Sequence, residues 1–170
     1  MLGLSTLGII HTAISLVAVG AAIIAFFRDK GITSDNGLGK VYVIATVLTC
    51  LTGFGIFNHG GFGKAHVLGV ITLLVLGLAW AAGQGKLGAK SLYIETVSYS
   101  LTFYFHLIPA ITETSIRLPV GKPLVDSPEA EPLKAAAGIL FLLFLIGAWL
   151  QVRRLRAGER SSIAPLRKSA

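Results

Sequence analysis

The chain has 170 residues, of which 54% are hydrophobic and only 14% are charged. Its mean hydropathy of +0.75 is higher than the surface of a water-soluble globular protein tolerates. The net charge of +7 does not indicate nucleic-acid binding, because the basic residues stand at the ends of apolar stretches and in the C-terminal segment. The only cysteine, Cys50, lies inside an apolar stretch and is expected to be a buried packing residue rather than part of a disulfide.

Five apolar stretches dominate the sequence, each close to the ~20 residues that cross ~30 Å of hydrocarbon as a helix. They cover residues 4–27, 41–58, 65–83, 92–114 and 134–152. The first stretch has no small-x-small cleavage site at its end, so we expect a helix of the mature protein and not a signal peptide. The prediction is an all-α integral membrane bundle of five transmembrane helices (residues 1–152) followed by a basic tail (153–170).

Lys and Arg residues are distributed unequally between the two sides of this arrangement. Eleven fall on one side: Arg28, Lys30, Lys40, Lys86, Lys90, Arg153, Arg154, Arg156, Arg160, Arg167 and Lys168. Four fall on the other side: Lys64, Arg117, Lys122 and Lys134. The positive-inside rule places the larger group in the cytoplasm. We therefore expect the N-terminus outside and the C-terminus in the cytoplasm.

Four histidines are predicted toward the outer face of the bundle. His11 lies about two turns into the first stretch, and His106 lies in the outer half of the fourth. Both should sit roughly 8 to 13 Å below the outer interface. His59 and His66 flank the short connection between the second and third stretches. Ionisable groups inside a membrane are costly unless they face the bundle interior, so these histidines are candidates for a functional site.

The fourth stretch also contains a polar stripe. Its members are spaced by 4, 3, 4, 7 and 4 positions, which keeps them on one helix face: Glu95, Tyr99, Thr102, His106, Glu113 and Arg117. Glu113 and Arg117 are expected to form an ion pair. Glu95 is expected to cap the helix or to pair with Lys86 or Lys90, and a proton path that starts at Glu95 is the alternative. Smaller polar stripes on the first two stretches should face it: His11, Ser15, Tyr42, Thr46 and Thr49.

Three interpretations fit the histidines. In the first, His11 and His106, at matched depth on two helices, are the axial ligands of a b-type haem. In the second, His11, His59, His66 and His106, together with Glu113, bind zinc, copper or iron directly. In the third, the histidines form hydrogen bonds between helices or titrate at the interface.

Three segments carry a family resemblance: IIHTAISLVAVG in the first stretch, GKVYV at the start of the second, and LTGFGIFNHGGFG at its end. With these segments, residues 7–85 resemble a family of small bacterial membrane proteins to which no activity is assigned. The family's His-Arg pair is replaced by Gly37 and Leu38, and its His-Arg-x-x-Met near the fourth helix is missing, so the chain resembles a divergent member. The resemblance implies a helical membrane fold and a bacterial origin.

Taken together, these features predict a multi-pass protein of the bacterial inner membrane with an outer-leaflet histidine site. That site would bind haem or a transition metal for electron transfer or metal-dependent redox chemistry. One alternative is a transporter of a metal ion or small polar solute along the polar stripe. Another is an accessory subunit without chemistry, whose basic tail contacts anionic lipid headgroups. The glycines in the second and third stretches predict close helix packing, within the chain, in a homo-oligomer or in a larger membrane complex: Gly53, Gly55, Gly69 and Gly77.

Overall fold

The computed structural model describes residues 5–57 and 61–168, with side chains described as far as residue 158. The described residues form five α-helices and one short 3₁₀ helix, with no strand among them, so the all-α prediction is confirmed. The helices are α1 (Thr6–Arg28), α2 (Gly37–Gly53), α3 (Lys64–Gly83), α4 (Ser91–Arg117) and α5 (Glu131–Lys168), with η1 (Gly88–Lys90) before α4. His59, one of the predicted metal ligands, lies outside the described residues.

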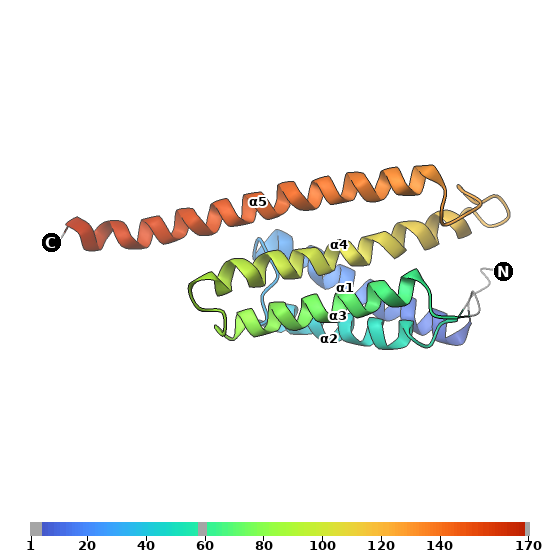
Figure 1. The fold of residues 1–170 in the computed structure, drawn as a ribbon, viewed down its shortest axis with the longest axis horizontal. Helices are drawn as coiled ribbons and strands as arrows, with labels where there is room; N and C mark the ends of the chain where they lie inside the picture. The colour runs from blue at the N-terminus through green and yellow to red at the C-terminus, as the bar shows by residue number, and fades with distance from the viewer. Residues whose placement is uncertain (1–4, 58–60, 169–170) are drawn as a thin grey trace.

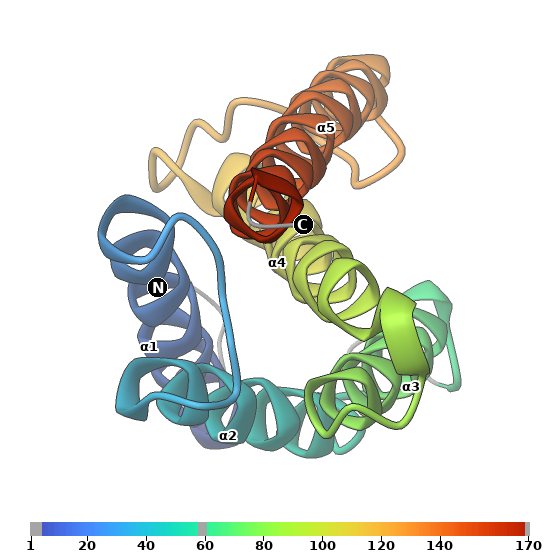
Figure 2. The same ribbon diagram turned by 90° about the vertical axis from the view of Figure 1, so that its left-hand side faces the viewer.

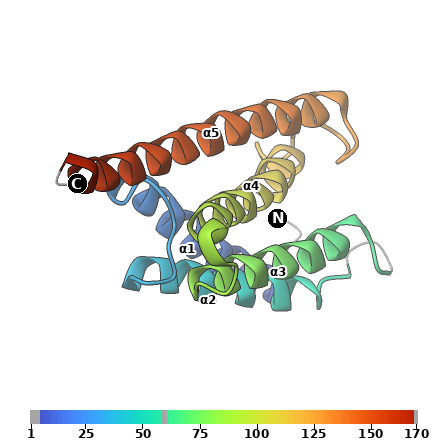
Figure 3. The same cartoon turned by 60° about the vertical axis from the view of Figure 1, so that its left-hand side comes forward.

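The helices form two packed hairpins and a covering helix. α1 packs mainly against α2, and α3 packs mainly against α4. All five helices follow the long axis of the molecule, and the C-terminal part of α5 extends beyond the other four (Figure 1). In the end view, α4 lies between α5 and a layer made of α1, α2 and α3 (Figure 2). The same order is visible from an intermediate direction (Figure 3). α4 is therefore the central helix of the fold.

The helix bounds differ from the predicted stretches where polar residues cap the helices. α2 begins at Gly37, four residues before the apolar stretch, because the Asn36 side chain accepts a hydrogen bond from the Gly39 amide at 2.8 Å. Ser5 caps α1 in the same way, with its hydroxyl oxygen 3.1 Å from the Gly8 amide nitrogen. α5 does not end at residue 152 but continues to Lys168, so the predicted basic tail is a continuation of the fifth helix.

Small side chains allow the first two helices to approach closely. The core contains Ala45 of α2, Ala79 of α3 and four alanines of α1: Ala18, Ala21, Ala22 and Ala25. Small residues let helix backbones approach where hydrophobic burial cannot drive association in lipid. Of the glycines predicted to pack closely, Gly55 faces Leu7 and Gly69 faces Phe54 within this chain, whereas Gly77 faces no atom within 4 Å. Cys50 is buried and unpaired, as predicted.

Large apolar side chains cover the outside of the bundle, as expected for a surface that faces lipid. They include Leu16 (65% exposed) on α1, Leu74 (69% exposed) on α3, and Leu142 (60% exposed) on α5. Three helices are long and apolar enough to cross a membrane: Thr6–Arg28, Lys64–Gly83 and Glu131–Gly158. α2 is apolar but has only 17 residues, about 25 Å of helix. α4 has 27 residues, but its polar stripe lowers its hydropathy. Three of the five predicted spans therefore meet the criteria for a span.

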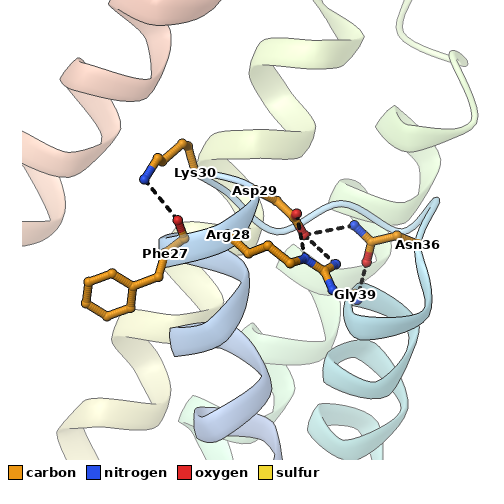
Figure 4. A network of polar contacts seen from close by, with 6 residues as sticks. All are labelled: Phe27, Arg28, Asp29, Lys30, Asn36 and Gly39. Atoms are coloured by element: carbon orange, nitrogen blue, oxygen red, sulfur yellow. Dashed lines mark hydrogen bonds and ion pairs between the residues drawn. The ribbon is translucent and has the colours of Figure 1, made fainter.

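A polar network holds the connection between α1 and α2 (Figure 4). Arg28 donates two hydrogen bonds of 2.8 Å to the Asp29 carboxylate, and Asn36 donates a third at 3.1 Å. The hydrogen bonds from Arg28 are the main reason that the pKa of the Asp29 carboxyl lies below its usual value. Because Asn36 also caps α2, this network ties the end of one helix to the start of the next.

The tight turn at this connection predicts different effects for two neighbouring glycines. A Cβ atom at Gly39 would overlap the backbone carbonyl of Thr33, whereas a Cβ atom at Gly37 would meet nothing within 4 Å. Gly39→Ala should therefore lower stability by about 2 kcal/mol, because the backbone must shift. The matched control Gly37→Ala should be neutral or slightly stabilising. Thermal unfolding of the detergent-purified variants, followed by circular dichroism, measures both effects. Equal melting temperatures for the two variants would contradict the described turn.

Candidate functional site

The stripe on α4 is buried from Glu95 to His106, and its middle part faces polar residues of α2. Every α4 residue that the structure buries is polar: Glu95, Thr96, Ser98, Tyr99, Ser100, Thr102 and His106. We use the name polar core for six buried polar residues, two from α2 and four from α4: Tyr42, Thr46, Glu95, Tyr99, Thr102 and His106. Buried polar groups are costly unless they are hydrogen-bonded, so the partners of these residues define the site.

Two hydrogen bonds cross the bundle from α2 to α4. The Tyr42 hydroxyl lies 2.7 Å from the Thr102 hydroxyl, and the Thr46 hydroxyl lies 3.1 Å from Nε2 of His106. The Tyr42 hydroxyl also lies close to Thr46, and the Tyr42 ring meets the His106 ring edge-on at 6.1 Å between centroids. Tyr42, Thr46 and Thr102 are fully buried. The middle of the polar core is therefore a packed chain of hydroxyl groups that ends on an imidazole.

Glu95 lies at the other end of the polar core and is 5% exposed. Its Oε1 atom accepts hydrogen bonds from the amide and the hydroxyl of Ser34, both at 3.2 Å. The expected pairing with Lys86 or Lys90 was wrong, because Glu95 points into the bundle. Lys86 instead lies over the Trp80 ring, 4.9 Å from its centroid.

The close packing around Glu95 depends on a residue that we did not predict. A Cβ atom at Gly83 of α3 would lie 2.7 Å from both Oε1 of Glu95 and the Ser34 hydroxyl. The missing side chain at Gly83 therefore leaves the space that the carboxylate occupies. No sequence motif at Gly83 or Ser34 identifies either residue as a neighbour of Glu95. The three residues meet only in the tertiary fold.

Tyr99 lies between Glu95 and Tyr42 along the polar core. Its side chain is fully buried, and its hydroxyl lies next to Ser34 without a well-aligned hydrogen bond to any described residue. The Tyr99 and Tyr42 rings meet edge-on at 6.3 Å. A buried hydroxyl without a partner is rare in folded proteins and requires an explanation. The Tyr99 hydroxyl is therefore a fully buried hydrogen-bonding group of the polar core that stays available to a proton or a polar guest.

His11 and Ser15 of α1 extend the polar groups toward the N-terminal end of α1. Nδ1 of His11 lies 3.0 Å from the Thr52 hydroxyl, which already donates to the Leu48 carbonyl at 2.7 Å. The Thr52 oxygen must therefore accept from Nδ1, which leaves Nε2 of His11 with its lone pair. Ser15 lies 3.3 Å from the Thr49 hydroxyl. Both His11 and His106 thus form hydrogen bonds between helices, as the third interpretation describes.

The remaining predicted metal ligands do not join His11 and His106. His66 is stacked between Phe57 and Phe62, at 5.0 and 5.1 Å. Its Nδ1 accepts from the Gly63 amide at 3.1 Å, so a neutral ring has its proton on Nε2, which is buried without a partner. Glu113 is half exposed and paired with Arg117 at 2.7 Å, as predicted.

Among the described residues, no group of three or more His, Cys, Asp or Glu side chains lies close enough together to hold a metal ion. The predicted multi-histidine metal site has no support there and stays a prediction. The sequence matches no model of a protein family, no curated protein and no solved structure. The resemblance to the bacterial family stays a prediction as well.

The haem interpretation makes a direct spectroscopic prediction. If His11 and His106 ligate a b-type haem, detergent-purified protein will show a Soret band that shifts on reduction with dithionite, with resolved α and β bands. His106→Ala should then abolish the low-spin spectrum, and His66→Ala should leave it unchanged. A featureless spectrum of protein purified after growth with added haem precursor would contradict this interpretation.

Proposed function

We propose that the protein is a five-span membrane protein of the bacterial inner membrane that translocates protons through its polar core. The single observation that carries this proposal is the buried face of α4, which is polar along its length from Glu95 to His106. Burying such a face inside an apolar bundle costs free energy that a purely structural helix avoids. A function that requires exchangeable protons in the membrane interior accounts for this cost.

The two ends of the structure support the proposed orientation. The 2.7 Å ion pair between Lys64 and Glu129 brings the start of α3 next to the connection between α4 and α5. At the opposite end, the hydrogen bonds from Ser34 to Glu95 bring the connection between α1 and α2 next to the start of α4. The bundle therefore separates the four basic residues of one predicted side from those of the other. By the positive-inside rule, the end with Glu95 faces the cytoplasm.

The chemistry of the polar core favours protons over larger solutes. Hydroxyl, imidazole and carboxyl groups both donate and accept protons, and the side chains of Tyr42, Thr46, Tyr99 and Thr102 are packed without exposure. Transfer along such a chain needs only rotation of hydroxyl groups, whereas a solute would have to separate the helices. We therefore favour proton translocation over the transport of a metal ion or a polar solute.

Each residue has a definite role in the proposed path. Glu95 exchanges a proton with the cytoplasmic side, since it lies four residues from the start of α4. The Tyr99 hydroxyl carries the proton from Glu95 by rotating, and the hydroxyls of Tyr42 and Thr46 pass it on, since Thr46 is the group bonded to Nε2 of His106. His106 receives it on one ring nitrogen and releases it from the other, which reverses its tautomer without a net change in charge.

Neutralising Glu95 tests this path directly. We expect Glu95→Gln to reduce proton flux by about tenfold or more, because an amide cannot exchange a proton as a carboxyl does. The measurement is the pH change inside proteoliposomes that contain a trapped fluorescent dye, under a potassium-driven membrane potential. The matched control is Glu113→Gln, which removes a carboxylate from the same helix outside the polar core and should retain the flux.

Two results would contradict the proposal. Flux through Glu95→Gln equal to that of the unchanged protein would remove Glu95 from the path. Flux through the unchanged protein no greater than through empty liposomes would favour the alternative of an accessory subunit without chemistry.

Gly83 provides a second test that leaves every ionisable group in place. Gly83→Ala must displace the Glu95 carboxylate or the Ser34 hydroxyl, because the new Cβ would lie 2.7 Å from each. We expect a loss of flux comparable to that of Glu95→Gln. Gly77→Ala on the same helix meets nothing within 4 Å and should keep the flux. Equal flux in the two alanine variants would show that the position of Glu95 does not matter.

A further inference from the structure

A cleft of about 550 Å³ lies where the α1–α2 connection, the start of α4 and the C-terminal half of α5 meet. Its lining combines cationic, amide and hydroxyl groups with apolar side chains: Lys30, Thr33, Leu92, Gln151, Arg154 and Leu155. None of these residues belongs to the polar core. The cleft lies at the same end of the bundle as Glu95.

Gln151 joins the three elements around this cleft. Its Oε1 atom accepts a hydrogen bond from the Ser100 hydroxyl of α4 at 2.8 Å, and its Nε2 donates to the Lys30 carbonyl at 3.3 Å. Gly31 lies directly beside it, because a Cβ atom there would meet Nε2 of Gln151 at 3.4 Å. The hydrogen bonds of Gln151 therefore fix the position of α5 at the cleft relative to α4 and to the α1–α2 connection.

The charges around the cleft favour an anion. Lys30 and Arg154 both line it, and neither forms an ion pair with a described residue. The only acidic residue in the lining is Asp29, whose carboxylate already binds Arg28 and Asn36. The Lys30 amine donates to the Phe27 carbonyl at 2.9 Å and keeps further donors for a ligand (Figure 4).

The backbone of Lys30 adds an independent observation. Its φ angle of 63° lies in the left-handed region, which glycine adopts at no cost and lysine adopts at a conformational cost. Lys30 is the only described residue other than glycine with a positive φ. Asp29 is the C-cap of α1, so Lys30 holds the next position, where many helices end in this conformation with glycine and this chain has lysine instead.

The surroundings point to a lipid as the source of the anion. Leu92, Leu155 and Ile32 give the cleft an apolar wall that a free inorganic anion does not need. The Arg153 guanidinium lies over the Trp149 ring, 5.5 Å from its centroid, one turn from the cleft. A tryptophan next to an arginine near the end of an apolar helix is typical of the level of the lipid headgroups. A phosphate that reaches this cleft with acyl chains attached would contact both walls.

We propose that this cleft binds the headgroup phosphate of one anionic phospholipid through Lys30 and Arg154. The lipid fastens α5 to the four-helix bundle at its cytoplasmic end. The proposal assigns the predicted contact between the basic tail and anionic headgroups to one site, with Lys30 and Arg154 as its cationic residues. The proposal does not depend on proton translocation, since it uses none of the residues of the polar core.

Native mass spectrometry of the detergent-purified full chain tests the proposal with phosphatidylglycerol as the probe. We expect one tightly bound phosphatidylglycerol per chain, and about fivefold weaker binding in Arg154→Gln and in Lys30→Gly. Lys30→Gly removes the amine and also relieves the positive φ, so it should fold at least as well as the unchanged chain. The matched control Arg156→Gln removes one charge from α5 outside the cleft and should bind like the unchanged chain.

Three outcomes would overturn the proposal. Equal weakening in all three variants would show general attraction to a basic surface. Equal binding of phosphatidylcholine would show that the anionic headgroup is not recognised. Displacement of phosphatidylglycerol by millimolar inorganic phosphate, with phosphate retained on the protein, would identify a soluble anion and not a lipid as the ligand.

Discussion

The polar face of α4 is the constraint on which the rest of the structure depends. A helix that places a carboxylate, an imidazole and several hydroxyls along one face can remain in an apolar environment only if other helices provide partners. α2 provides two of them across the bundle, where Tyr42 and Thr46 reach Thr102 and His106. These side chains are long enough to span helices whose backbones do not pack closely against each other. The interior between α2 and α4 is therefore polar, while α1 contributes four alanines to the apolar core and two polar contacts to α2, from His11 and Ser15.

The position of α5 follows from the same constraint. α4 has polar and aromatic groups on its opposite side as well, and α5 covers them: the Tyr104 ring contacts Phe141 and Phe144, and Ser100 binds Gln151. α5 has no residue buried within its most apolar segment, so it covers α4 without being enclosed itself. Few contacts attach α5 to the bundle. Among them, the Gln151 side chain forms the hydrogen bond that reaches the α1–α2 connection. A lipid bound beside Gln151 would reinforce the least enclosed part of the fold.

The sequence predicted the helices and the polar stripe but not the partners within the site. Apolar stretches marked all five helices, and the spacing of Glu95, Tyr99, Thr102 and His106 placed them on one buried face. The pairing of Glu95 could not be predicted, because its partner Ser34 is 61 positions away and the nearby lysines looked like better candidates. Matched depth suggested that the histidines converge, yet depth does not determine which ring nitrogen is free. For His66, the local hydrogen bond from Gly63 decides that question, and no spacing rule reveals it.

Under the proposed function, the buried Tyr99 hydroxyl is the group that would let a packed core move protons. A chain of hydroxyl groups in which every donor has a partner transfers one proton and then points the wrong way for the next. To work again, each group must rotate, and rotation must start where a hydroxyl is not already held. Tyr99 is such a group, and it lies between the carboxylate of Glu95 and the hydrogen-bonded pair of Tyr42 and Thr102. If the core conducts protons as proposed, the free energy lost by a buried hydroxyl without a well-aligned partner, about 1 to 3 kcal/mol, is the cost of resetting the core after each transfer.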